Sequence, residues 1–387
     1  MDETIYEVSE DTLLLYESLK EILSSEKKIF RTSLEIGVGN GKISSLLGEH
    51  CKHTGVDINP FAIQKTKTLA KGTFFESNLF QNIPKQSFDL IVCNPPYIPS
   101  SKKDPDDWIT KATVGGKHGY EFILSFLESA REYLSKNGSI ILLFSSLSKP
   151  PIILEYLEKA LLSYELVKKT SILLEELFVY RITKSKLLKH LEDQGFTSIS
   201  FFAKGKHGEI IKLSKNEQEY ALKKTHSNNR SLSVSKKEAE KLQFVNSLEK
   251  KSIGPKFISY NEEFSYLLYE FVKGISYTVF LETATYEEKV YSFKELLRQC
   301  YILDLAGFSK KELTRPSKNI IINYPQITLI DFERGVFTKK PSNVTQFLQF
   351  LSKVYPSKKQ FIITIAKDYK EKPSFESLIN KLESFVF

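Results

Sequence analysis

Cysteine is scarce in this chain, and long apolar runs are missing from it. The three cysteines, Cys51, Cys93 and Cys300, are isolated and odd in number among 387 residues. They show neither the spacing of a metal site nor the pairs of a disulfide framework, so a reducing compartment fits. No apolar run approaches the length that spans a membrane, and the stretch Met1-Asp-Glu-Thr does not resemble a signal peptide. We therefore expect a cytoplasmic protein with no membrane association.

The net charge of +8 is unevenly shared along the chain. Residues 1–185 carry 22 Lys and Arg against 24 Asp and Glu, whereas residues 186–387 carry 33 against 23. A chain of this length typically forms two domains, and no Gly-, Ser- or Pro-rich linker separates the halves near residues 183–186. We expect domains at 1–185 and 186–387, and the basic second one is suited to meet a polyanion.

Residues 1–185 alternate between strand-like and helical patterns. Helices are expected at 11–23 and at 119–135, the second ended by Gly138. Strands are expected at 32–37, 53–57, 73–76, 88–93, 139–144, 164–171 and 176–182. Such alternation predicts an α/β fold, in which helices cover both faces of a doubly wound, mostly parallel, Rossmann-like sheet.

Three glycines spaced by two, Gly37, Gly39 and Gly41, follow the first expected strand. Glycine lets the chain turn sharply and lets a ligand lie against the backbone, although this spacing is not the full dinucleotide fingerprint. Asp57 ends the second expected strand, where an acidic residue can accept hydrogen bonds from both hydroxyls of a ribose. Because ligands of such sheets bind beyond the carboxyl ends of the strands, the order of these features indicates a nucleoside-containing ligand.

The residues Asn94-Pro95-Pro96-Tyr97 follow the apolar run at 88–93. The Asn94 side chain and the Pro95 carbonyl can both accept hydrogen bonds from one NH2 group, and the proline ring fixes φ and removes a competing donor. Tyr97 can cover the flat face of an amide or a base. The pattern favours a pocket for a planar nitrogen, and the alternative is a Pro-rich turn that ends a buried strand.

Together these segments resemble the HemK-type class I methyltransferases, most closely the archaeal and eukaryotic branch that methylates a glutamine side chain of a class-I translation release factor. The resemblance covers about residues 5–182 and includes Val8-Ser-Glu10-Asp11-Thr12 and Gly115-Gly116-x-x-Gly119. Val8 stands where the branch usually has Pro. The resemblance implies S-adenosylmethionine as the cofactor and a release factor as the protein partner. It also brings in a small zinc-binding activator subunit, which relatives of this branch often need.

Carried over by position, the resemblance also implies which residues hold the cofactor. Thr12, Glu35 and Gly37 are expected beside its methionine part, and Gly39 belongs to the glycine turn. Asp57 is expected at its ribose, and Asn78 and Leu79 beside its adenine. Asn78 replaces the usual Asp. Its side-chain carbonyl can still accept a hydrogen bond from the adenine amino group, so we expect binding to survive.

The expected pocket indicates how an amide nitrogen becomes reactive. Such a nitrogen is a poor nucleophile because its lone pair is delocalised into the carbonyl. If Asn94 and the Pro95 carbonyl each accept one N–H, the lone pair can face the methyl donor, and proximity can contribute roughly 7–11 kcal/mol. His118 is a candidate base, against the alternative of a solvated loop histidine. The same pocket also suits adenine N6 or guanine N2 of a nucleic acid, although the slightly acidic first half argues mildly against that.

Residues 186–387 contain segments in the order of a protein kinase. These segments are a loop with Gly205 and Gly208, Lys223 on a strand, Glu238 on the next helix, Glu270 before a hinge, Glu312 with Asn319, and Asp331. Lys223 would grip nucleotide phosphates and pair with Glu238, and Asp331 and Asn319 would bind Mg²⁺. Each of these residues, taken alone, could equally be an ordinary solvent-exposed side chain. Their order, however, indicates Mg-ATP.

This second series resembles the small atypical kinases of archaea related to the RIO kinases and to the kinase subunit of the KEOPS complex. The nearest likeness, over about residues 195–345, is to the archaeal kinase that phosphorylates a ribose 2′-hydroxyl of tRNA. Glu312 stands in the place of the catalytic Asp, Lys310 in that of a His, and Glu333 in that of a Gly. Only 52 residues follow Gly335, too few for a large peptide-binding lobe, so the basic charge favours tRNA as the substrate.

We therefore predict a bifunctional protein of the translation apparatus, a glutamine methyltransferase fused to an ATP-dependent kinase. In one alternative, a nucleic-acid methyltransferase is joined to a catalytically silent domain that binds nucleotide or RNA. In another, one half mainly stabilises the other.

Overall fold

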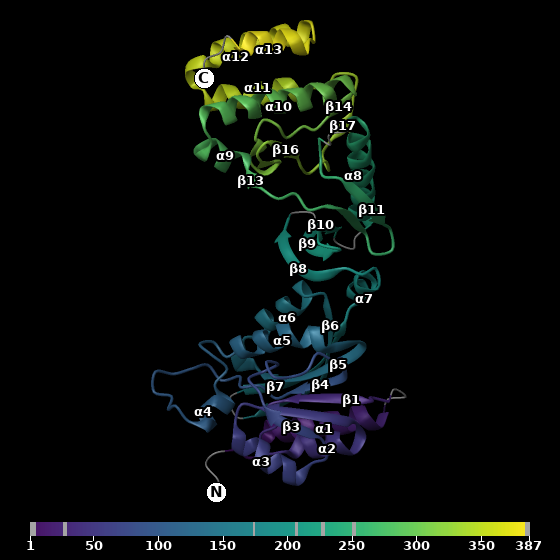
Figure 1. Ribbon diagram of the computed structural model, residues 1–387, viewed down its shortest axis with the longest axis vertical. Coiled ribbons are helices and arrows are strands. Elements are labelled where there is room, and N and C mark those ends of the chain that lie inside the picture. The colour runs from purple at the N-terminus through teal and green to yellow at the C-terminus, as the bar shows by residue number, and fades with distance from the viewer. Residues whose placement is uncertain are drawn as a thin grey trace. The chain divides into compact units, whose positions relative to one another are not determined.

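A computed structural model describes residues 5–25, 29–172, 175–205, 208–225, 229–249 and 253–383. The chain forms two compact units, Met1–Gly195 and Phe196–Phe387 (Figure 1). The helix α7 (Lys186–Asp193) was assigned to the second domain from the sequence, but it belongs to the first unit. Two ion pairs hold it there, Lys184 with Glu192 at 2.9 Å and Lys136 with Asp193 at 2.6 Å.

The described strands of the first unit form one sheet in the order β3-β2-β1-β4-β5-β7-β6. These strands are β1 (Thr32–Ile36), β2 (Lys52–Asp57), β3 (Thr73–Glu76), β4 (Phe88–Cys93), β5 (Leu134–Ser145), β6 (Leu162–Ile172) and β7 (Glu175–Lys184). The helices besides α7 are α1 (Glu10–Ser25), α2 (Lys42–His50), α3 (Pro60–Leu69), α4 (Trp108–Thr113), α5 (Glu121–Tyr133), η1 (Ser146–Ser148) and α6 (Pro150–Lys159).

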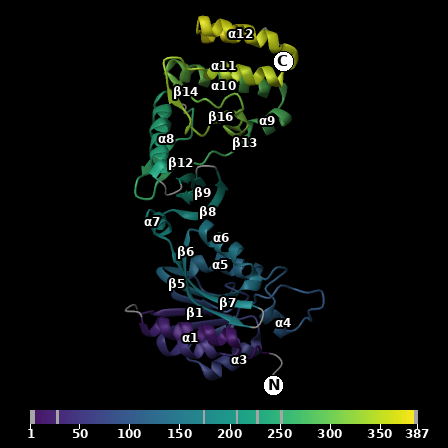
Figure 2. The ribbon, with the colours of Figure 1, turned by 180° about the vertical axis from the view of Figure 1, so that it is seen from behind.

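The first five strands pair in parallel, and β7 runs antiparallel to both β5 and β6. Helices α1, α2 and α3 lie on one face of the sheet and α5 and α6 on the other (Figures 1 and 2). The expected doubly wound α/β fold is therefore confirmed. Because helices cover both faces, the central strands are largely buried, and Leu90, Ile91 and Val92 of β4 are fully buried.

The strand expected at 139–144 is longer than the sequence indicated. It begins at Leu134 and passes through Gly138, which therefore does not end the preceding helix. A side chain at position 138 would approach the backbone oxygen of Phe88 to 2.9 Å and Cδ1 of Leu134 to 2.6 Å. Phe88 of β4 pairs with Leu134 and Leu90 pairs with Ser139, so the pairing of the two strands is irregular between these points. Gly138 lies in this irregular stretch, where the chain comes back close to β4 and leaves no room for a side chain.

The second unit begins with a five-stranded antiparallel sheet in the order β11-β12-β10-β9-β8. Its strands are β8 (Thr197–Lys204), β9 (Gly208–Lys215), β10 (Gln218–Thr225), β11 (Phe257–Asn261) and β12 (Tyr266–Glu270). Short strands follow at β13 (Ile275–Ser276), β14 (Phe308–Ser309), β15 (Ile320–Asn323), β16 (Gln326–Leu329) and β17 (Val336–Phe337). The helices are α8 (Asn229–Ser247), α9 (Tyr277–Thr283), α10 (Tyr286–Leu305), η2 (Pro316–Lys318), α11 (Asn343–Val354), η3 (Pro356–Lys358), α12 (Lys359–Glu371) and α13 (Phe375–Glu383).

One hydrophobic core runs through the second unit. It joins Leu242 of α8 and Leu267 of β12 to Leu297 of α10 and Phe347 of α11. The second unit is thus an additional α/β domain with its own core. Among the described residues of the whole chain, no helix is both long and apolar enough to cross a membrane.

Gly48 gives a direct test of the packing in the first unit. Alanine normally stabilises a helix relative to glycine by up to about 1 kcal/mol. A Cβ on Gly48 of α2, however, would overlap the backbone oxygen of Lys71. We expect Gly48→Ala to lower the free energy of unfolding by about 1–3 kcal/mol. Glu49→Ala, at the exposed neighbouring position, should change it by less than about 0.5 kcal/mol.

The measurement is chemical unfolding followed by fluorescence of Trp108, which reports on the first unit because the chain contains one Trp. A Gly48→Ala variant that is as stable as the wild type or more so would contradict the packing described.

Candidate functional site

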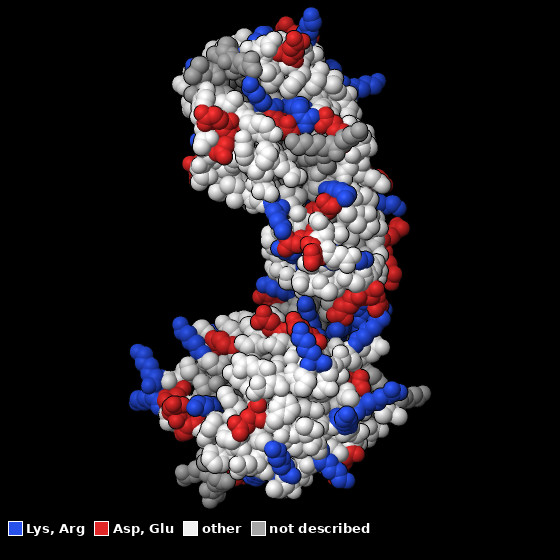
Figure 3. Space-filling model, in the orientation of Figure 1, with Lys and Arg blue, Asp and Glu red and all other residues white. Residues whose placement is uncertain are grey.

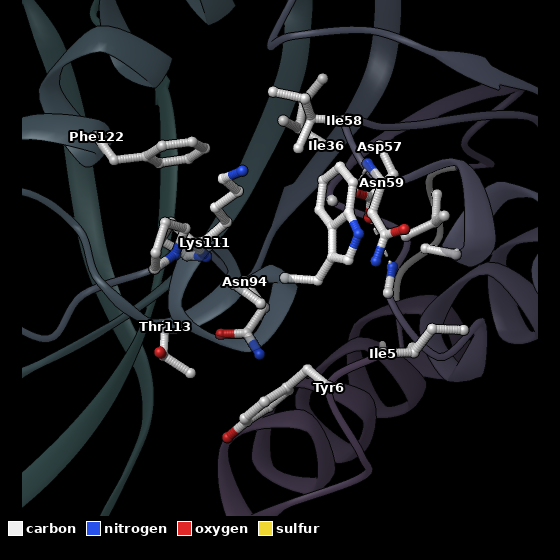
Figure 4. A pocket seen from close by; sticks show the side chains of 18 of the residues that line it. Ile5, Tyr6, Ile36, Asp57, Ile58, Asn59, Asn94, Lys111, Thr113 and Phe122 are labelled. Carbon is white, nitrogen blue, oxygen red and sulfur yellow. Dashed lines mark hydrogen bonds between the residues drawn. The ribbon is translucent and has the colours of Figure 1, made fainter. Parts of the chain in front are cut away.

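A cavity of about 430 Å³ opens in the first unit beyond the carboxyl ends of β1, β2 and β4 (Figure 4). Apart from the candidate base His118, the residues that were assigned to methyl transfer and its cofactor from the sequence line this cavity: Thr12, Glu35, Gly37, Gly39, Asp57, Asn78, Leu79, Asn94, Pro95, Pro96 and Tyr97. Parallel strands bring these residues together although they are far apart in the sequence. The same cavity is also lined by four residues for which no role was expected from the sequence: Tyr6, Asp11, Trp108 and Lys111.

The glycine turn forms an open floor for this cavity. Gly37 has φ +83° and Gly39 has φ +48°, in the left-handed region that favours glycine. A Cβ built on either residue would meet no atom within 4 Å, so the backbone faces open space. A ligand can therefore lie directly against these two peptide units.

Asp57 is held in place beside the turn by backbone donors. Gly39 N–H donates to its Oδ2 at 3.0 Å, and Asn59 N–H donates to its Oδ1 at 2.9 Å. Burial raises the pKa of Asp57, while these N–H groups oppose that rise. Each carboxylate oxygen has lone pairs beyond those that the backbone uses, so Asp57 can still accept hydrogen bonds from a ligand.

Asn94, directly after β4, presents an unused acceptor to the cavity. Its Nδ2 donates to Oδ2 of Asp11 at 3.1 Å. Its Oδ1 is buried and has no hydrogen-bond partner within the part of the chain that the structure describes. A buried acceptor without a partner is costly, and binding a donor removes that cost. The site therefore fits a ligand that brings an N–H group to Asn94.

Tyr97 packs beside Asn94 and is 8% exposed. Its hydroxyl donates to the same oxygen of Asp11 at 3.4 Å, as does the hydroxyl of Tyr6, also at 3.4 Å. Burial, followed by the charge of Asp11, raises the pKa of both tyrosines. In the sequence, Asp11 was marked only by its place in the segment 8–12, which carried the family resemblance. Nothing in its position along the chain showed that its side chain contacts Asn94.

Glu35 lies beneath the glycine turn and is 3% exposed. It accepts a hydrogen bond from Ser44 and lies 3.5 Å from Nε2 of His53. Burial raises its pKa. His118, the candidate base, instead places Nδ1 2.8 Å from Oε1 of Glu121 and is not among the described residues that line the cavity.

The second unit has its own cavity, of about 1000 Å³, beneath the five-stranded sheet. Six residues that the sequence assigned to nucleotide binding or catalysis line it: Gly205, Gly208, Lys223, Glu238, Glu312 and Asp331. Lys206 and His207, between the two glycines in the sequence, lie outside the described residues. Glu270 and Asn319 are not among the described residues that line this cavity.

Both of those residues have other partners. Glu270 pairs with Lys256 at 2.9 Å. Asn319 is 7% exposed and donates from Nδ2 to Glu312 at 3.3 Å. Glu312 also pairs with Arg334 at 3.0 Å, so both of its oxygens are engaged.

Lys223 lies among three carboxylates. Its Nζ is 2.7 Å from Glu238, so the ion pair expected from the sequence is present, and it is 3.5 Å from both Asp331 and Glu333. Burial opposes the charge of Lys223, but Glu238 and Asp331 raise its pKa. Oxygens of Glu238, Asp331 and Glu333 lie within 4.8 Å of one another. Such an oxygen-rich group suits a hard divalent cation.

Lys310 lies behind this group and is fully buried. Its Nζ donates to the backbone oxygen of Asp331 at 2.6 Å and lies 5.0 Å from the centre of the Phe332 ring. Asp331 has φ +61°, which is uncommon for a residue with a side chain. Lys310 therefore fixes the backbone that carries the Asp331 carboxylate. Burial lowers the pKa of Lys310 to about 8.

Comparison with known proteins gives one matching family and several similar proteins. The family described as "Methyltransferase small domain" matches residues 7–173. A protein of Methanocaldococcus jannaschii, provisionally named protein N5-glutamine methyltransferase, is 36% identical over 183 residues, which are 45% of this chain and 89% of that protein. The release factor glutamine methyltransferase of Geobacter sulfurreducens is 35% identical over 119 residues, 27% of this chain and 42% of that protein. The chain thus spans less than half of that bacterial relative.

Among solved structures, that of the bifunctional kinase-methyltransferase WbdD is similar over 97% of this chain and 87% of the WbdD chain. The sequence identity is 16% and the TM-score is 0.44.

The buried Lys310 predicts a pH dependence of stability. Its pKa is about 8 in the folded state, against an ordinary value of 10.5. Below pH 8 the lysine is charged in both states, and the folded state bears the full cost of burying that charge. As the pH rises from 8 toward 10.5, this cost disappears and stability is gained.

We expect the wild type to gain about 2–3 kcal/mol relative to Lys310→Met between pH 7 and pH 10. The other effects of the substitution do not depend on pH and cancel in this comparison. The measurement is urea unfolding of the full chain by circular dichroism, with the transition of the first unit identified by Trp108 fluorescence. Parallel pH profiles for the two proteins would show that Lys310 is not the buried cation described.

Proposed function

Through its first unit the chain belongs to the HemK-like class I methyltransferases, which use S-adenosylmethionine, and we propose that it methylates the side-chain amide nitrogen of a glutamine in a translation release factor. The observation that carries this proposal is the buried, unpartnered Oδ1 of Asn94, in the same cavity as the open glycine turn. The name of the Geobacter relative supports the release factor as the acceptor.

Residues of the glycine turn and the neighbouring strand ends fit the cofactor. The open space over Gly37 and Gly39 accommodates a ligand that a side chain would exclude. In a complex with the cofactor, Asp57 would accept hydrogen bonds from the ribose hydroxyls, Asn78 and Leu79 would flank the adenine, and Thr12 and Glu35 would lie by the methionine part. S-adenosylmethionine supplies a methyl group on a positively charged sulfur, which leaves as a neutral thioether.

The acceptor end of the cavity orients an amide. Oδ1 of Asn94 and the carbonyl of Pro95 each accept one N–H of the glutamine side chain, and Tyr97 and Pro96 complete the wall around that amide. Two acceptors at fixed positions hold the nitrogen with its lone pair directed at the methyl carbon. The nitrogen loses its proton to solvent after it has gained a positive charge, so no strong base is required. The protein thus contributes mainly orientation.

Adenine N6 or guanine N2 of a nucleic acid is the competing acceptor, because each presents an NH2 group on a planar system. The balance of 22 basic against 24 acidic residues in the first half disfavours a polyanion there. The activator subunit expected from the family resemblance stays a prediction for this chain, as does its location in the cytoplasm.

We further propose that the second unit binds Mg-ATP and transfers phosphate to tRNA. The specific observation is the Lys223–Glu238 pair in a large cavity that Asp331 and Glu312 also line. Lys223 neutralises the phosphates, and Asp331 with Glu238 or Glu333 holds the metal ion, which together supply the electrostatic part of phosphoryl transfer.

The choice of tRNA as the phosphate acceptor rests on the charge of the second half of the chain. Residues 186–387 carry 33 basic against 23 acidic residues, which favours RNA. Among the described residues on the face that Figure 3 shows, basic and acidic side chains are interspersed rather than gathered in one patch. The competing reading is a domain that binds nucleotide or RNA without catalysis.

Two substitutions separate cofactor binding from methyl transfer. Asp57→Asn removes a charged acceptor and should weaken S-adenosylmethionine binding about 10- to 100-fold. Asn94→Ala should leave that affinity within about twofold and lower kcat on the order of 100-fold or more. Glu76→Gln, an exposed residue at the end of β3, is the matched control.

The measurements are calorimetry for the cofactor and methyl incorporation into release factor, tRNA and DNA, with mass spectrometry of the modified residue. The proposed acceptor would be rejected if the methyl group were found on a nucleic-acid base, or if no glutamine of the release factor were methylated.

Phosphoryl transfer is tested with labelled ATP, Mg²⁺ and tRNA. The wild type should label tRNA, and Lys223→Ala should reduce that rate on the order of 100-fold because the phosphates lose their cation. Lys224→Ala, at the next position of β10, is the control. Methyl transfer should be unchanged in both variants. If the wild type transfers no phosphate to tRNA, or if Lys223→Ala transfers it as fast, the kinase proposal fails and the binding module is favoured.

A further inference from the structure

Asp11 is a buried carboxylate that none of the roles above uses. It lies in the first turn of α1, is 4% exposed and lines the first cavity. Its Oδ2 receives donors from Asn94 at 3.1 Å and from the hydroxyls of Tyr6 and Tyr97 at 3.4 Å each. Its Oδ1 accepts from the backbone N–H of Thr12 at 2.5 Å and from the Thr12 hydroxyl at 3.2 Å. Both oxygens of this carboxylate therefore accept hydrogen bonds from donors of the protein itself.

The chemistry of a carboxylate decides how Asn94 is oriented. An asparagine side chain has a donor end and an acceptor end of nearly the same shape, so its neighbours determine which end faces a cavity. An ionised carboxylate only accepts hydrogen bonds. Asp11 therefore binds the NH2 end of Asn94, and the oxygen end is left buried without a partner at the cavity.

We propose that Asp11 is a positioning residue for methyl transfer, which keeps Oδ1 of Asn94 facing the acceptor amide. This inference rests on the proposed function of the first unit and adds a residue to it. If Asn94 turned over, its NH2 group would meet the NH2 group of the acceptor, and two donors cannot form a hydrogen bond. Asp11 thus selects a primary amide or amine without touching it.

The two tyrosines support this role. Burial and the charge of Asp11 raise the pKa of each, so both remain protonated and donate to the carboxylate. They hold Asp11 from one side while Asn94 approaches from another. Figure 4 shows Tyr6 and Asn94 at the same end of the cavity, with Thr113 on the other side of Asn94. The carboxylate is therefore fixed before an acceptor enters.

The test is a double-mutant cycle in the full chain with Asp11→Asn, Asn94→Ala and the two combined. Asparagine at position 11 keeps the size of the side chain but offers both a donor and an acceptor, so Asn94 is no longer held in one orientation. We expect Asp11→Asn to lower kcat for release-factor methylation about 10- to 100-fold. The affinity for S-adenosylmethionine should stay within twofold. In the Asn94→Ala background, the same substitution should have almost no further effect on kcat.

Glu10→Gln, the exposed acidic residue in the same turn of α1, should leave kcat unchanged. The proposal is overturned if the effects of Asp11→Asn and Asn94→Ala multiply, because Asp11 would then act independently of Asn94. It is also overturned if the loss of activity follows a loss of cofactor affinity, as a purely structural role would produce.

A second readout needs no acceptor. The side-chain amide of Asn94, assigned by its disappearance in Asn94→Ala, should show slow hydrogen exchange in the NMR spectrum of the wild type and faster exchange in Asp11→Asn. Equal exchange in the two proteins rejects the positioning role. If the wild type does not methylate release factor but this difference in exchange is present, the proposed function fails and the role of Asp11 stands.

Discussion

The hydrogen bond between the amide of Asn94 and the carboxylate of Asp11 determines what the first cavity can bind. It joins the first turn of α1 to the end of β4, segments separated by 83 positions in the chain. Because the carboxylate takes the donor end of the amide, the acceptor end is left for a ligand. In a buried site an acceptor without a partner is unfavourable, so the cavity is complementary to a group that brings hydrogen atoms on nitrogen.

The rest of the first unit supports this one arrangement. Helices on both faces bury the central strands, so the ends of β1, β2 and β4 are fixed relative to one another. The glycine turn at Gly37 and Gly39 leaves open space, and Asp57 is held beside it by two backbone N–H groups. The regions proposed for the cofactor and for the acceptor are therefore held in place by the protein's own contacts, and such preorganisation reduces the entropy lost on binding.

Much of this could be predicted from the sequence because it depends on local patterns. The apolar run at 88–93 predicted β4, and the rule that ligands bind at the carboxyl ends of parallel strands brought Asp57 and Asn94 to one cavity. Gly138 was misinterpreted because a glycine that ends a helix and a glycine in an irregular stretch of strand pairing look the same in a sequence. The contact of Asp11 with Asn94 joins residues 83 positions apart, which no spacing in the chain reveals. Glu270 and Asn319 have nearer partners, Lys256 and Glu312, but the order of the motifs does not show that these contacts replace a place in the cavity.

The second unit shows how buried charges are balanced. Lys223 stands among Glu238, Asp331 and Glu333, and Lys310 donates to the backbone of Asp331 from behind. Buried charges are tolerated only where partners and hydrogen bonds compensate for lost water. Glu312, the candidate base, likewise pairs with Arg334 and accepts a hydrogen bond from Asn319, so it links these two residues.

The most direct test of the central claim is a crystal structure of the full chain with S-adenosylhomocysteine and a glutamine-containing release-factor peptide. The account predicts that the glutamine amide nitrogen lies within about 3 Å of both Oδ1 of Asn94 and the carbonyl oxygen of Pro95, with the NH2 group of Asn94 still on Asp11. A structure in which Asn94 turns its oxygen away from the glutamine, or in which the amide binds elsewhere, would contradict the account.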